Sequence, residues 1–589
     1  MATRRSIPKH LLDAAMAPAA DPVITIQGSS GLSPATEKAI TEVAKAVTVA
    51  IDAGATHIEW KTAPDPRMRP HAGFIYKSRP VFKPSPQQAD FFREVREGRG
   101  NLILRAVAGA GKTTTLIEGL RFMGGAVFFG AYNKAIVKEI QTKAEDAKVI
   151  RQGIFIKTFH AAGMRAFCNL HKTTRVDDRK TLDLARDYIK EKVSHQFLDQ
   201  CMPFVTKMIS FGKQFLLGVV TDLHSHSEWL KLIEHFSMDQ ELPEHIPVTE
   251  VLPHVIELYI RSHRKCPEVI DFDDMLYAPL AYGCRFDTHK WVLIDEAQDA
   301  NLARRIMAKK MLAPGGRVIA VGDEFQAIYG FTGAGGDSLQ KIQEMFNCKV
   351  MPLTVTYRCA HKIVEYAHQW VDHIQAMEGA PEGIVRAALI DLKSPKTPWF
   401  MLEKPIPTDA VICRYTKPLV ACAYGMLREG IACKIEGRDL GKNLIKLATR
   451  WKISRIDTLN ARLDDYQSNE VRKAQLAKNS KREAEAIDQV ATLRIFIERC
   501  KAKGLNDIEQ LCYEIEMLFE DNVAGAVKLC TGHKAKGREW DKVYWLQSAN
   551  RMRPGQPWQE QEELNLKYVI ATRAKLELVL VPEKEKDFG

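Results

Sequence analysis

Short runs of apolar, often β-branched residues recur along the chain and alternate with longer segments whose apolar positions are spaced as on one face of a helix. The first series consists of NLILRAVA (101–108), GAVFFGA (125–131), WVLIDE (291–296) and RVIAVGD (317–323). Continuous apolar runs of this length are typical of strands buried on both faces of a parallel sheet. The pattern therefore predicts an α/β domain in which helices cover a parallel sheet.

A second series of the same kind follows in the last 240 or so residues of the 589-residue chain. Its runs are DAVICRY (409–415), VKLCT (527–531), KVYWLQS (542–548) and LELVLV (576–581). The chain has no sequence repeat at a fixed period, but two α/β halves of similar plan suggest duplication of a fold. We therefore predict two parallel-sheet domains.

Two segments interrupt these series with helical spacing and many charges, which indicates a helical insertion in each domain. The second contains VRKAQLAKNSKREAEAIDQVATLRIFIERCKAKG (471–504), whose spacing and charge favour long solvent-exposed helices. The predicted layout is an N-terminal extension and linker (1–80), a first domain (81–164 plus 271–347) with its insertion (165–270), and a second domain (348–440 plus 525–589) with a compact insertion (441–524).

Composition agrees with a multidomain globular protein, because 589 residues are too many for one core and the hydrophobic share of 46% is ordinary. The net charge of +11 weakly favours a polyanionic partner such as nucleic acid. The twelve cysteines lack metal-ligand spacing, which indicates reduced thiols. Without an apolar run of membrane-spanning length, we expect no membrane partner and a soluble cytoplasmic protein of bacterial or phage type.

The segment NLILRAVAGAGKTTTL places a predicted strand before a glycine-containing loop and a helix, which is the order that phosphate binding requires. Gly109 and Gly111 allow backbone N–H groups to point inward, Lys112 can reach the β and γ oxygens, and the Thr113 hydroxyl can bind Mg²⁺. The general pattern begins with glycine where this chain has Ala106. The residues expected around the nucleotide phosphates are Ala108, Gly109, Ala110, Gly111, Lys112, Thr113 and Thr114.

In WVLIDEAQDA, an apolar strand delivers two adjacent carboxylates to the edge of the sheet where ligands of α/β proteins bind. Asp295 is expected to hold Mg²⁺, and Glu296 to orient and deprotonate the attacking water. Together with the glycine loop, this pair predicts nucleotide hydrolysis with ATP and Mg²⁺.

The motifs AGAGKT, DEAQD, VGDEFQAIYGFTGA and TGHKAKGREW together resemble the UvrD/Rep group of superfamily 1 helicases over residues 81–580. AYNKAIVKEI (131–140) and the compact second insertion look more similar to the F-box helicase and small phage helicase branch. The resemblance implies two RecA-like domains with ATP in the cleft between them. It also implies a series of nucleotide-site roles: Gln88 reads adenine, Tyr357 stacks on the base, Gln326 senses the γ-phosphate, Arg358 and Arg573 contact that phosphate, and Glu539 lies near the ribose.

The same resemblance implies a track for a single DNA strand. The residues matching its motifs are Asn133, Thr158, Phe159, His160, Phe331, Thr531 and His533. For Tyr329, packing is slightly favoured over stacking on a base. The basic stretches 67–80 and 261–267 could extend the track through phosphate contacts, or could be solvated linkers.

The sequence departs from the family pattern in three places. Ala131 stands where many relatives have a stacking phenylalanine, and Phe331 stands where tryptophan is common. Better-known relatives continue beyond the motif containing Arg573 into a strand-separating hairpin, whereas this sequence ends at LELVLVPEKEKDFG. We expect either that another part supplies the wedge or that the protein translocates without efficient unwinding.

We therefore expect an ATP-dependent DNA helicase that moves 3′ to 5′ on single-stranded DNA and acts at junctions with duplex. The polarity follows from the resemblance alone. Alternatives are a translocase that remodels protein–DNA complexes, an ATP-gated DNA-binding module, and a motor on RNA. The sequence identifies no protein loading partner.

Overall fold

The computed structural model describes residues 55–61, 73–78, 82–191, 197–243, 245–330, 336–389, 397–476, 480–519, 525–547 and 557–582. The chain divides into two compact units, Met1–Ser85 and Pro86–Gly589. In the first unit, β1 (Ala55–Lys61) and β2 (Gly73–Ser78) form an antiparallel pair. The sequence analysis expected only an extension and linker in this region, so this small sheet is an addition.

The second unit contains a six-stranded sheet with the order β10-β3-β9-β8-β4-β5, and every neighbouring pair is parallel. Its strands are β3 (Leu102–Ala106), β4 (Val127–Ala131), β5 (Ile154–Thr158), β8 (His289–Ile294), β9 (Leu312–Gly322) and β10 (Lys349–Leu353). The four apolar runs of the first predicted series fall on β3, β4, β8 and β9, whose central residues are buried. The parallel sheet expected from these runs is confirmed.

Helices and short 3-10 turns connect these strands. They are α3 (Pro86–Glu97), α4 (Lys112–Gly119), η1 (Leu120–Phe122), α5 (Lys134–Asp146), α6 (Phe159–Leu170), α12 (Asp274–Ala281), η4 (Ala297–Asp299), α13 (Leu302–Lys310), η5 (Glu324–Gln326) and α14 (Ser338–Phe346). Helix α4 follows β3 after the loop 107–111, and α6 begins directly after β5. The loop and helix ends that carry the predicted motifs therefore lie at the carboxyl edge of this sheet.

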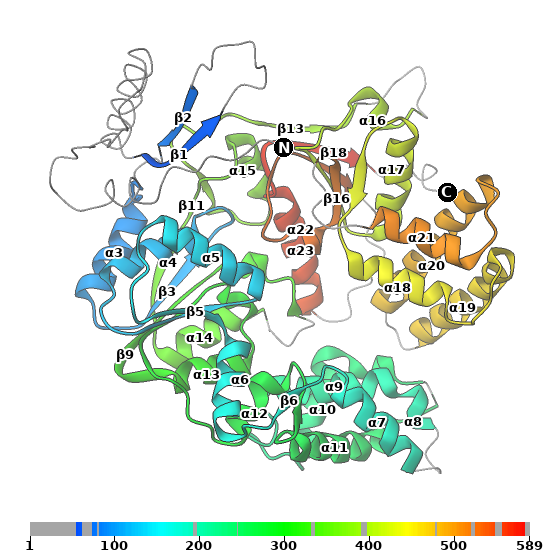
Figure 1. Ribbon diagram of the computed structural model, residues 1–589, viewed down its shortest axis with the longest axis horizontal. Helices are drawn as coiled ribbons and strands as arrows, with labels where there is room; N and C mark the ends of the chain where they lie inside the picture. The colour runs from blue at the N-terminus through cyan, green and yellow to red at the C-terminus, as the bar shows by residue number, and fades with distance from the viewer. Residues whose placement is uncertain are drawn as a thin grey trace, which may run out of the picture. The chain divides into compact units, whose positions relative to one another are not determined.

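A second six-stranded parallel sheet has the order β13-β18-β17-β14-β16-β15. Its strands are β13 (Ile384–Ala387), β14 (Ala410–Cys413), β15 (Cys433–Ile435), β16 (Val527–Thr531), β17 (Trp540–Gln547) and β18 (Ala574–Pro582). The accompanying helices are α15 (His361–Ala367), α16 (Trp399–Leu402), α17 (Thr416–Arg428), α22 (Gly532–Ala535) and α23 (Pro557–Ala571), with a two-stranded parallel pair of β11 (Val355–Thr356) and β12 (Gln375–Ala376). The second predicted α/β series thus also forms a parallel sheet (Figure 1).

The first helical group lies between β5 and β8 in the chain. It contains α7 (Lys180–Glu191), α8 (Phe197–Gln200), α9 (Met202–Gln214), α10 (His226–Phe236), η3 (Met238–Glu241) and α11 (Val248–Lys265), with the short parallel pair β6 (Arg175–Val176) and β7 (Val269–Ile270). Helices α7, α9, α10 and α11 pack on one another (Figure 1). Lys213 in α9 forms buried ion pairs of 2.7 Å with Asp271 and 2.9 Å with Asp274, which attach the group to the start of α12.

The second helical group contains α18 (Arg438–Ala448), α19 (Ile456–Leu476), α20 (Ser480–Ala502) and α21 (Ile508–Leu518). The sequence analysis favoured solvent-exposed helices here. Helix α20 instead buries Val490, Leu493, Phe496 and Ile497 against its neighbours. Most of the charged run thus lies in α20, and the apolar positions of this helix complete the core beside α17.

All twelve cysteines are free, and ten of them are buried, in agreement with reduced thiols. Among the helices of the described ranges, none combines the length and apolar character needed to cross a membrane.

Candidate active site

The loop between β3 and α4 has the backbone conformation that inward-pointing N–H groups require. Gly109 and Gly111 have φ angles of 73° and 74°, in the left-handed region that favours glycine. A Cβ atom on Gly109 would also lie 2.4 Å from Oγ1 of Thr356, so this position needs glycine for space as well as for conformation. Of the other predicted loop residues, Ala108 and Ala110 are buried, whereas Lys112, Thr113 and Thr114 are half-buried at the start of α4.

Thr113 and Asp295 meet at the end of this loop. The Thr113 hydroxyl donates a 2.8 Å hydrogen bond to Oδ2 of Asp295. Two adjacent ligands of an octahedral Mg²⁺ lie about 3 Å apart, so the two oxygens have the separation that this ion needs. Burial, followed by the neighbouring Glu296 carboxylate, raises the pKa of Asp295 to about 7. A cation at this point would relieve the repulsion and favour the ionised form.

Glu296 sits in a strained conformation for a residue with a side chain, with φ 49° and ψ 47°. Its carboxylate accepts a hydrogen bond from the Gln298 amide. Burial favours the neutral acid, but the Lys112 and Lys536 cations outweigh it and lower the pKa of Glu296 below its ordinary value. Glu296 is therefore ionised at neutral pH and can accept a proton.

An amide network joins Glu296 to the segment after β9. The backbone N–H of Asp323 donates to Oε1 of Gln298 over 3.1 Å, and the Gln326 amide donates to Oδ2 of Asp323 over 2.6 Å. Gln326, the predicted γ-phosphate sensor, is 4% exposed. Gln298 was not identified from the sequence, although it lies within the quoted DEAQD motif. Its contribution is to link two motifs that are distant in the chain.

The residues expected at the adenine lie together beside the first turn of α4. The side-chain amide of Gln88 donates to the Thr115 hydroxyl over 2.9 Å. The Tyr357 hydroxyl lies 3.5 Å from Oε1 of the same Gln88 side chain. Tyr357 is 42% exposed, so its ring is accessible for stacking. Gln87 was missed by the sequence analysis: it donates to the Thr354 hydroxyl over 2.8 Å and accepts from the Thr354 amide over 2.9 Å, which fixes the chain just before Tyr357.

The two predicted arginines differ in their surroundings. Arg358 donates through Nε to Glu539 over 2.6 Å, so Glu539 is an ion-pair partner of this arginine. Arg573 is 1% exposed and donates through Nε to the Val569 carbonyl over 2.9 Å. Burial, followed by repulsion from Arg358, lowers the pKa of Arg573 to about 9. Its cation is thus held in a dry setting where an added negative charge would be strongly stabilising.

Three of the predicted strand-contacting residues have local structural roles. The Asn133 side chain caps α5 by accepting from the Ile136 amide, and the Thr158 hydroxyl caps α6 by accepting from the Ala161 amide. Phe159 is 3% exposed and packs edge-to-face on Phe128 at 5.4 Å. The Phe159 ring fills the space beside Gly130 in the core, and its contact with DNA stays a prediction.

His160 has a different environment, because its ring stacks on Phe272 with centroids 4.0 Å apart and planes inclined by 25°. Phe272 is 56% exposed, so the pair presents an aromatic surface to solvent at the start of α6. Burial, followed by the Arg304 cation, lowers the pKa of His160 to about 3, which keeps the imidazole neutral. Sequence reasoning missed Phe272. The available signal was an aromatic residue between carboxylates in VIDFDDML.

Thr531 ends β16, and His533 lies in α22 directly after it. The His533 carbonyl accepts a 3.2 Å hydrogen bond from the Tyr329 hydroxyl. The Tyr329 ring stacks parallel to Tyr132 at 6.3 Å and lies under the Lys536 ammonium at 4.7 Å. These contacts favour the packing interpretation of Tyr329. Phe331 lies outside the described residues.

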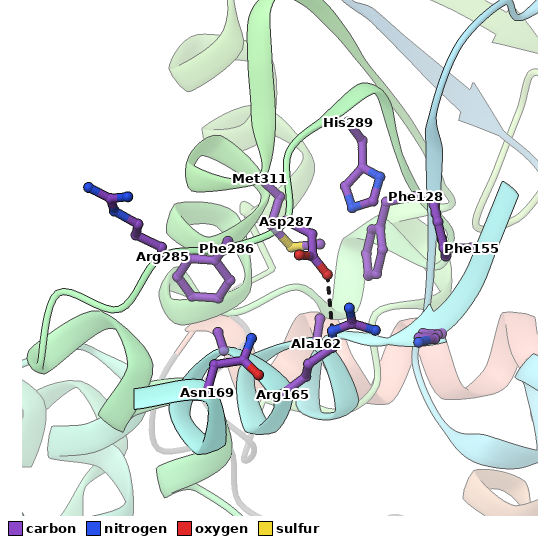
Figure 2. A pocket seen from close by; sticks show the side chains of 12 residues that line it. Phe128, Phe155, Ala162, Arg165, Asn169, Arg285, Phe286, Asp287, His289 and Met311 are labelled. Atoms are coloured by element: carbon purple, nitrogen blue, oxygen red, sulfur yellow. Dashed lines mark ion pairs between the residues drawn. The ribbon is translucent and has the colours of Figure 1, made fainter. Parts of the chain in front are cut away.

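A separate hollow lies near the amino end of β8, away from the phosphate loop. Figure 2 shows its lining, with the rings of His289 and Phe128 beside an ion pair of 3.1 Å between Arg165 and Asp287. Its volume is about 30 Å³, which accommodates a single water molecule. The buried Nδ1 of His289 has no partner among the described residues, so a bound water is the ligand that this hollow fits.

Comparisons with known proteins agree with this arrangement. Residues 87–347 match the UvrD/REP helicase N-terminal domain, and residues 226–585, more than half of the chain, match the UvrD-like helicase C-terminal domain.

Among individual relatives, the chain is 23% identical over 296 residues to ATP-dependent DNA helicase Rep of Escherichia coli, covering 46% of this chain and 41% of that protein. It is 25% identical over 297 residues to DNA helicase II of Haemophilus influenzae, covering 46% and 38%. It is 22% identical over 310 residues to ATP-dependent DNA helicase PcrA of Staphylococcus epidermidis, covering 49% and 40%. The matched regions thus span less than half of each of these relatives. The two domain matches, on a chain with two parallel sheets and the phosphate loop described above, show that it belongs to the UvrD/Rep-like family of superfamily 1A helicases.

Proposed function

We propose that the protein is an ATP-dependent DNA helicase that moves 3′ to 5′ on single-stranded DNA and separates strands at junctions with duplex. The observation that carries the proposal is that groups of the two sheet regions meet beside the phosphate loop: the Ala108 N–H donates to the Tyr568 hydroxyl over 2.9 Å, and the Lys536 ammonium lies 2.8 Å from Oδ2 of Asp299. Catalytic groups supplied by two domains can respond to relative motion of those domains. The proposed RecA-like domains are 81–164 plus 271–347 and 348–440 plus 525–589, with insertions at 165–270 and 441–524 and an extension at 1–80.

In the proposed reaction, the loop amides and Lys112 bind the phosphates of ATP, and the ionised Glu296 accepts a proton from the attacking water. Thr113 and Asp295 are the protein ligands of Mg²⁺, which when bound neutralises charge on the phosphate oxygens. Arg358 and Arg573 stabilise the charge that develops on the γ-phosphate oxygens, and Gln326 detects that phosphate. Gln88 and Tyr357 hold the adenine, while Glu539 positions Arg358 and borders the ribose.

The proposed strand track runs over the His160–Phe272 pair and over Thr531 and His533 in the second domain. Stacking on aromatic rings is tolerant of sequence, which suits a motor that must pass over any base. Phe331 and the exposed amide of Asn133 are further proposed contacts. The direction of movement is transferred from the UvrD/Rep family.

The nucleotide site is tested by Glu296→Gln, which keeps the shape of the side chain but removes the proton acceptor. We expect ATP binding to persist and turnover to fall by about a hundredfold or more. Glu365→Gln on the exposed face of α15 is the matched control, because Glu365 forms only a surface ion pair with Lys362. Turnover near the parent rate in Glu296→Gln would show that the base is a different residue.

A partial duplex with either a 3′ or a 5′ single-stranded tail tests movement and polarity together. Strand displacement from the 3′-tailed substrate alone is the expected result. DNA-stimulated ATP hydrolysis without displacement would favour a translocase that remodels protein–DNA complexes, and hydrolysis indifferent to DNA would favour an ATP-gated binding module. Stronger stimulation by RNA of the same length would indicate an RNA motor.

A further inference from the structure

Helix α23 presents a row of polar groups on one side. Trp558, Glu562, Asn565 and Tyr568 are spaced by four, three and three residues, which places them along one face of the helix. The first and last are ten residues apart, or about 15 Å along the axis. Each member of the row contacts a part of the chain far away in sequence.

The carboxyl end of this row contacts the phosphate loop. The Tyr568 hydroxyl accepts a 2.9 Å hydrogen bond from the backbone N–H of Ala108, and Tyr568 is fully buried. A buried backbone N–H needs a partner, so this contact accounts for the Ala108 amide in the present state of the loop. If the loop rearranges around bound phosphates, either this hydrogen bond breaks or Tyr568 moves with the loop.

The middle of the row holds the segment that follows β9. The Asn565 amide donates to the Ala327 carbonyl over 2.8 Å and to the Glu324 carbonyl over 3.3 Å. The Glu562 carboxylate accepts from the Gly330 N–H. Gly330 directly precedes the proposed strand contact Phe331, so this side of α23 fixes the backbone at the residue before it.

The amino end of the row reaches the first helical group. The Trp558 indole N–H donates to the His235 carbonyl over 3.0 Å at the end of α10. A Cβ atom on Gly330 would lie 3.1 Å from the Trp558 ring, so the helix and the loop are in close contact here.

Beyond its last turn, α23 leads directly to Arg573. The Arg573 guanidinium donates back to the Val569 carbonyl over 2.9 Å and to the Arg538 carbonyl over 3.1 Å, which ties its position to the end of the helix. A displacement of α23 therefore displaces this cation as well.

We propose that α23 is the coupling helix of the motor, and that Tyr568 is the positioning residue through which it follows the phosphate loop. The inference rests on the proposed function, since it assumes a DNA-stimulated ATPase. A continuous hydrogen-bonded helix moves nearly as a rigid rod. Its hydrogen bonds to the Ala108 N–H, to the Gly330 N–H and from the Arg573 guanidinium therefore make the phosphate loop, Arg573 and the backbone at Gly330 change position together rather than independently.

The test is Tyr568→Phe, which removes the hydroxyl and keeps the ring. Tyr424→Phe is the matched control, because the Tyr424 hydroxyl is buried in α17 without a hydrogen-bond partner among the described residues. The quantity measured is the ratio of ATP turnover with saturating oligo-dT to turnover without DNA. We expect Tyr568→Phe to lower this ratio by about tenfold, the effect of losing one hydrogen bond from the linkage, and Tyr424→Phe to keep the parent ratio.

A second measurement uses the reciprocity of coupling between two ligands. The affinity for fluorescent oligo-dT is measured with and without a non-hydrolysable ATP analogue, and the factor by which the analogue changes it should shrink in Tyr568→Phe. A purely structural role would lower thermal stability while leaving both ratios unchanged, and that result would overturn the proposal. Glu562→Gln tests the contact of the row with Gly330 in the same two assays should Tyr568→Phe fail to fold.

The two levels of inference fail differently in these assays. If oligo-dT does not stimulate the parent protein, the proposed function is wrong. If the parent is stimulated and both Tyr568→Phe and Glu562→Gln are stimulated equally well, only the coupling role of α23 is wrong.

Discussion

His160 is a buried imidazole whose ionisation opposes folding. Its ordinary pKa is 6.5, and burial, followed by the Arg304 cation, lowers this pKa to about 3 in the folded protein. Between these two pKa values, the His160 imidazole is protonated in the unfolded chain and neutral in the folded protein. The stability associated with neutral His160 is fully present above pH 6.5 and is lost as the pH falls from 6.5 toward 3, at about 1.4 kcal/mol per pH unit.

This linkage predicts that His160→Asn is less sensitive to acid than the parent. Between about pH 7.5 and about pH 5 the thermal midpoint of the variant should fall less, because asparagine has no proton to gain. Differential scanning calorimetry at the two pH values measures the difference. The exposed His226 provides the control His226→Asn, which should follow the parent curve. Equal losses in parent and His160→Asn would mean that His160 titrates normally in the fold.

Individual nucleotide-site residues were predictable where one motif carries a complete chemical role. Lys112, Thr113, Asp295 and Glu296 follow from a strand, a glycine loop and adjacent carboxylates. Gln298 and Gln87 were not predictable in this way, because their roles are hydrogen bonds to partners more than twenty residues away. A pattern of residue types records what a side chain can do but not which distant group it meets.

Helix α6 packs against α12 through a glycine, Gly163, next to the start of the proposed strand track. A Cβ atom on Gly163 would lie 2.0 Å from the Met275 carbonyl oxygen, so Gly163→Ala must push the two helices apart. We expect a loss of about 1–3 kcal/mol in stability, typical of overpacking. His160 lies in the first turn of α6, and Phe272 lies just before α12. Separation of the two helices should therefore also weaken the binding of oligo-dT.

Urea unfolding and fluorescence anisotropy measure these two effects. Gly124→Ala is the control, since a Cβ atom there would meet no atom within 4 Å. Wild-type stability and DNA affinity in Gly163→Ala would show that the helices can separate at little cost.

Strands and helices were predicted best where burial is continuous. The eight long apolar runs all fall on strands of the two sheets. Strands β5, β10 and β13 of the two sheets were not predicted, since exposed and half-buried positions interrupt their apolar residues. The three-residue strand β15 and the pair β1 and β2 also escaped notice. The charged run in α20 was assigned to solvent because charge density masked the apolar positions Val490, Leu493 and Phe496, whose burial depends on helices elsewhere in the chain.

A buried ion pair links the two sheet regions. Lys536 follows α22 in the second sheet region, and its ammonium lies 2.8 Å from Oδ2 of Asp299 and 2.7 Å from the Gln326 carbonyl. The two side chains are 9% and 3% exposed. Burial alone would lower the pKa of Lys536, but Asp299 and Glu296 outweigh it and raise that pKa, so the cation persists.

Lys536→Met should therefore open the cleft between the sheets, because it leaves the Asp299 carboxylate buried without its partner at a cost of about 3–5 kcal/mol. Small-angle X-ray scattering should show a larger radius of gyration, and DNA-stimulated ATP turnover should fall as Arg573 withdraws from Glu296. Asp299→Asn in the Lys536→Met background removes the unpaired charge, so the double variant should be more compact and more stable than Lys536→Met alone. Additive losses from the two substitutions would instead mean that Lys536 and Asp299 act separately, and that other contacts, such as those of α23, keep the cleft closed.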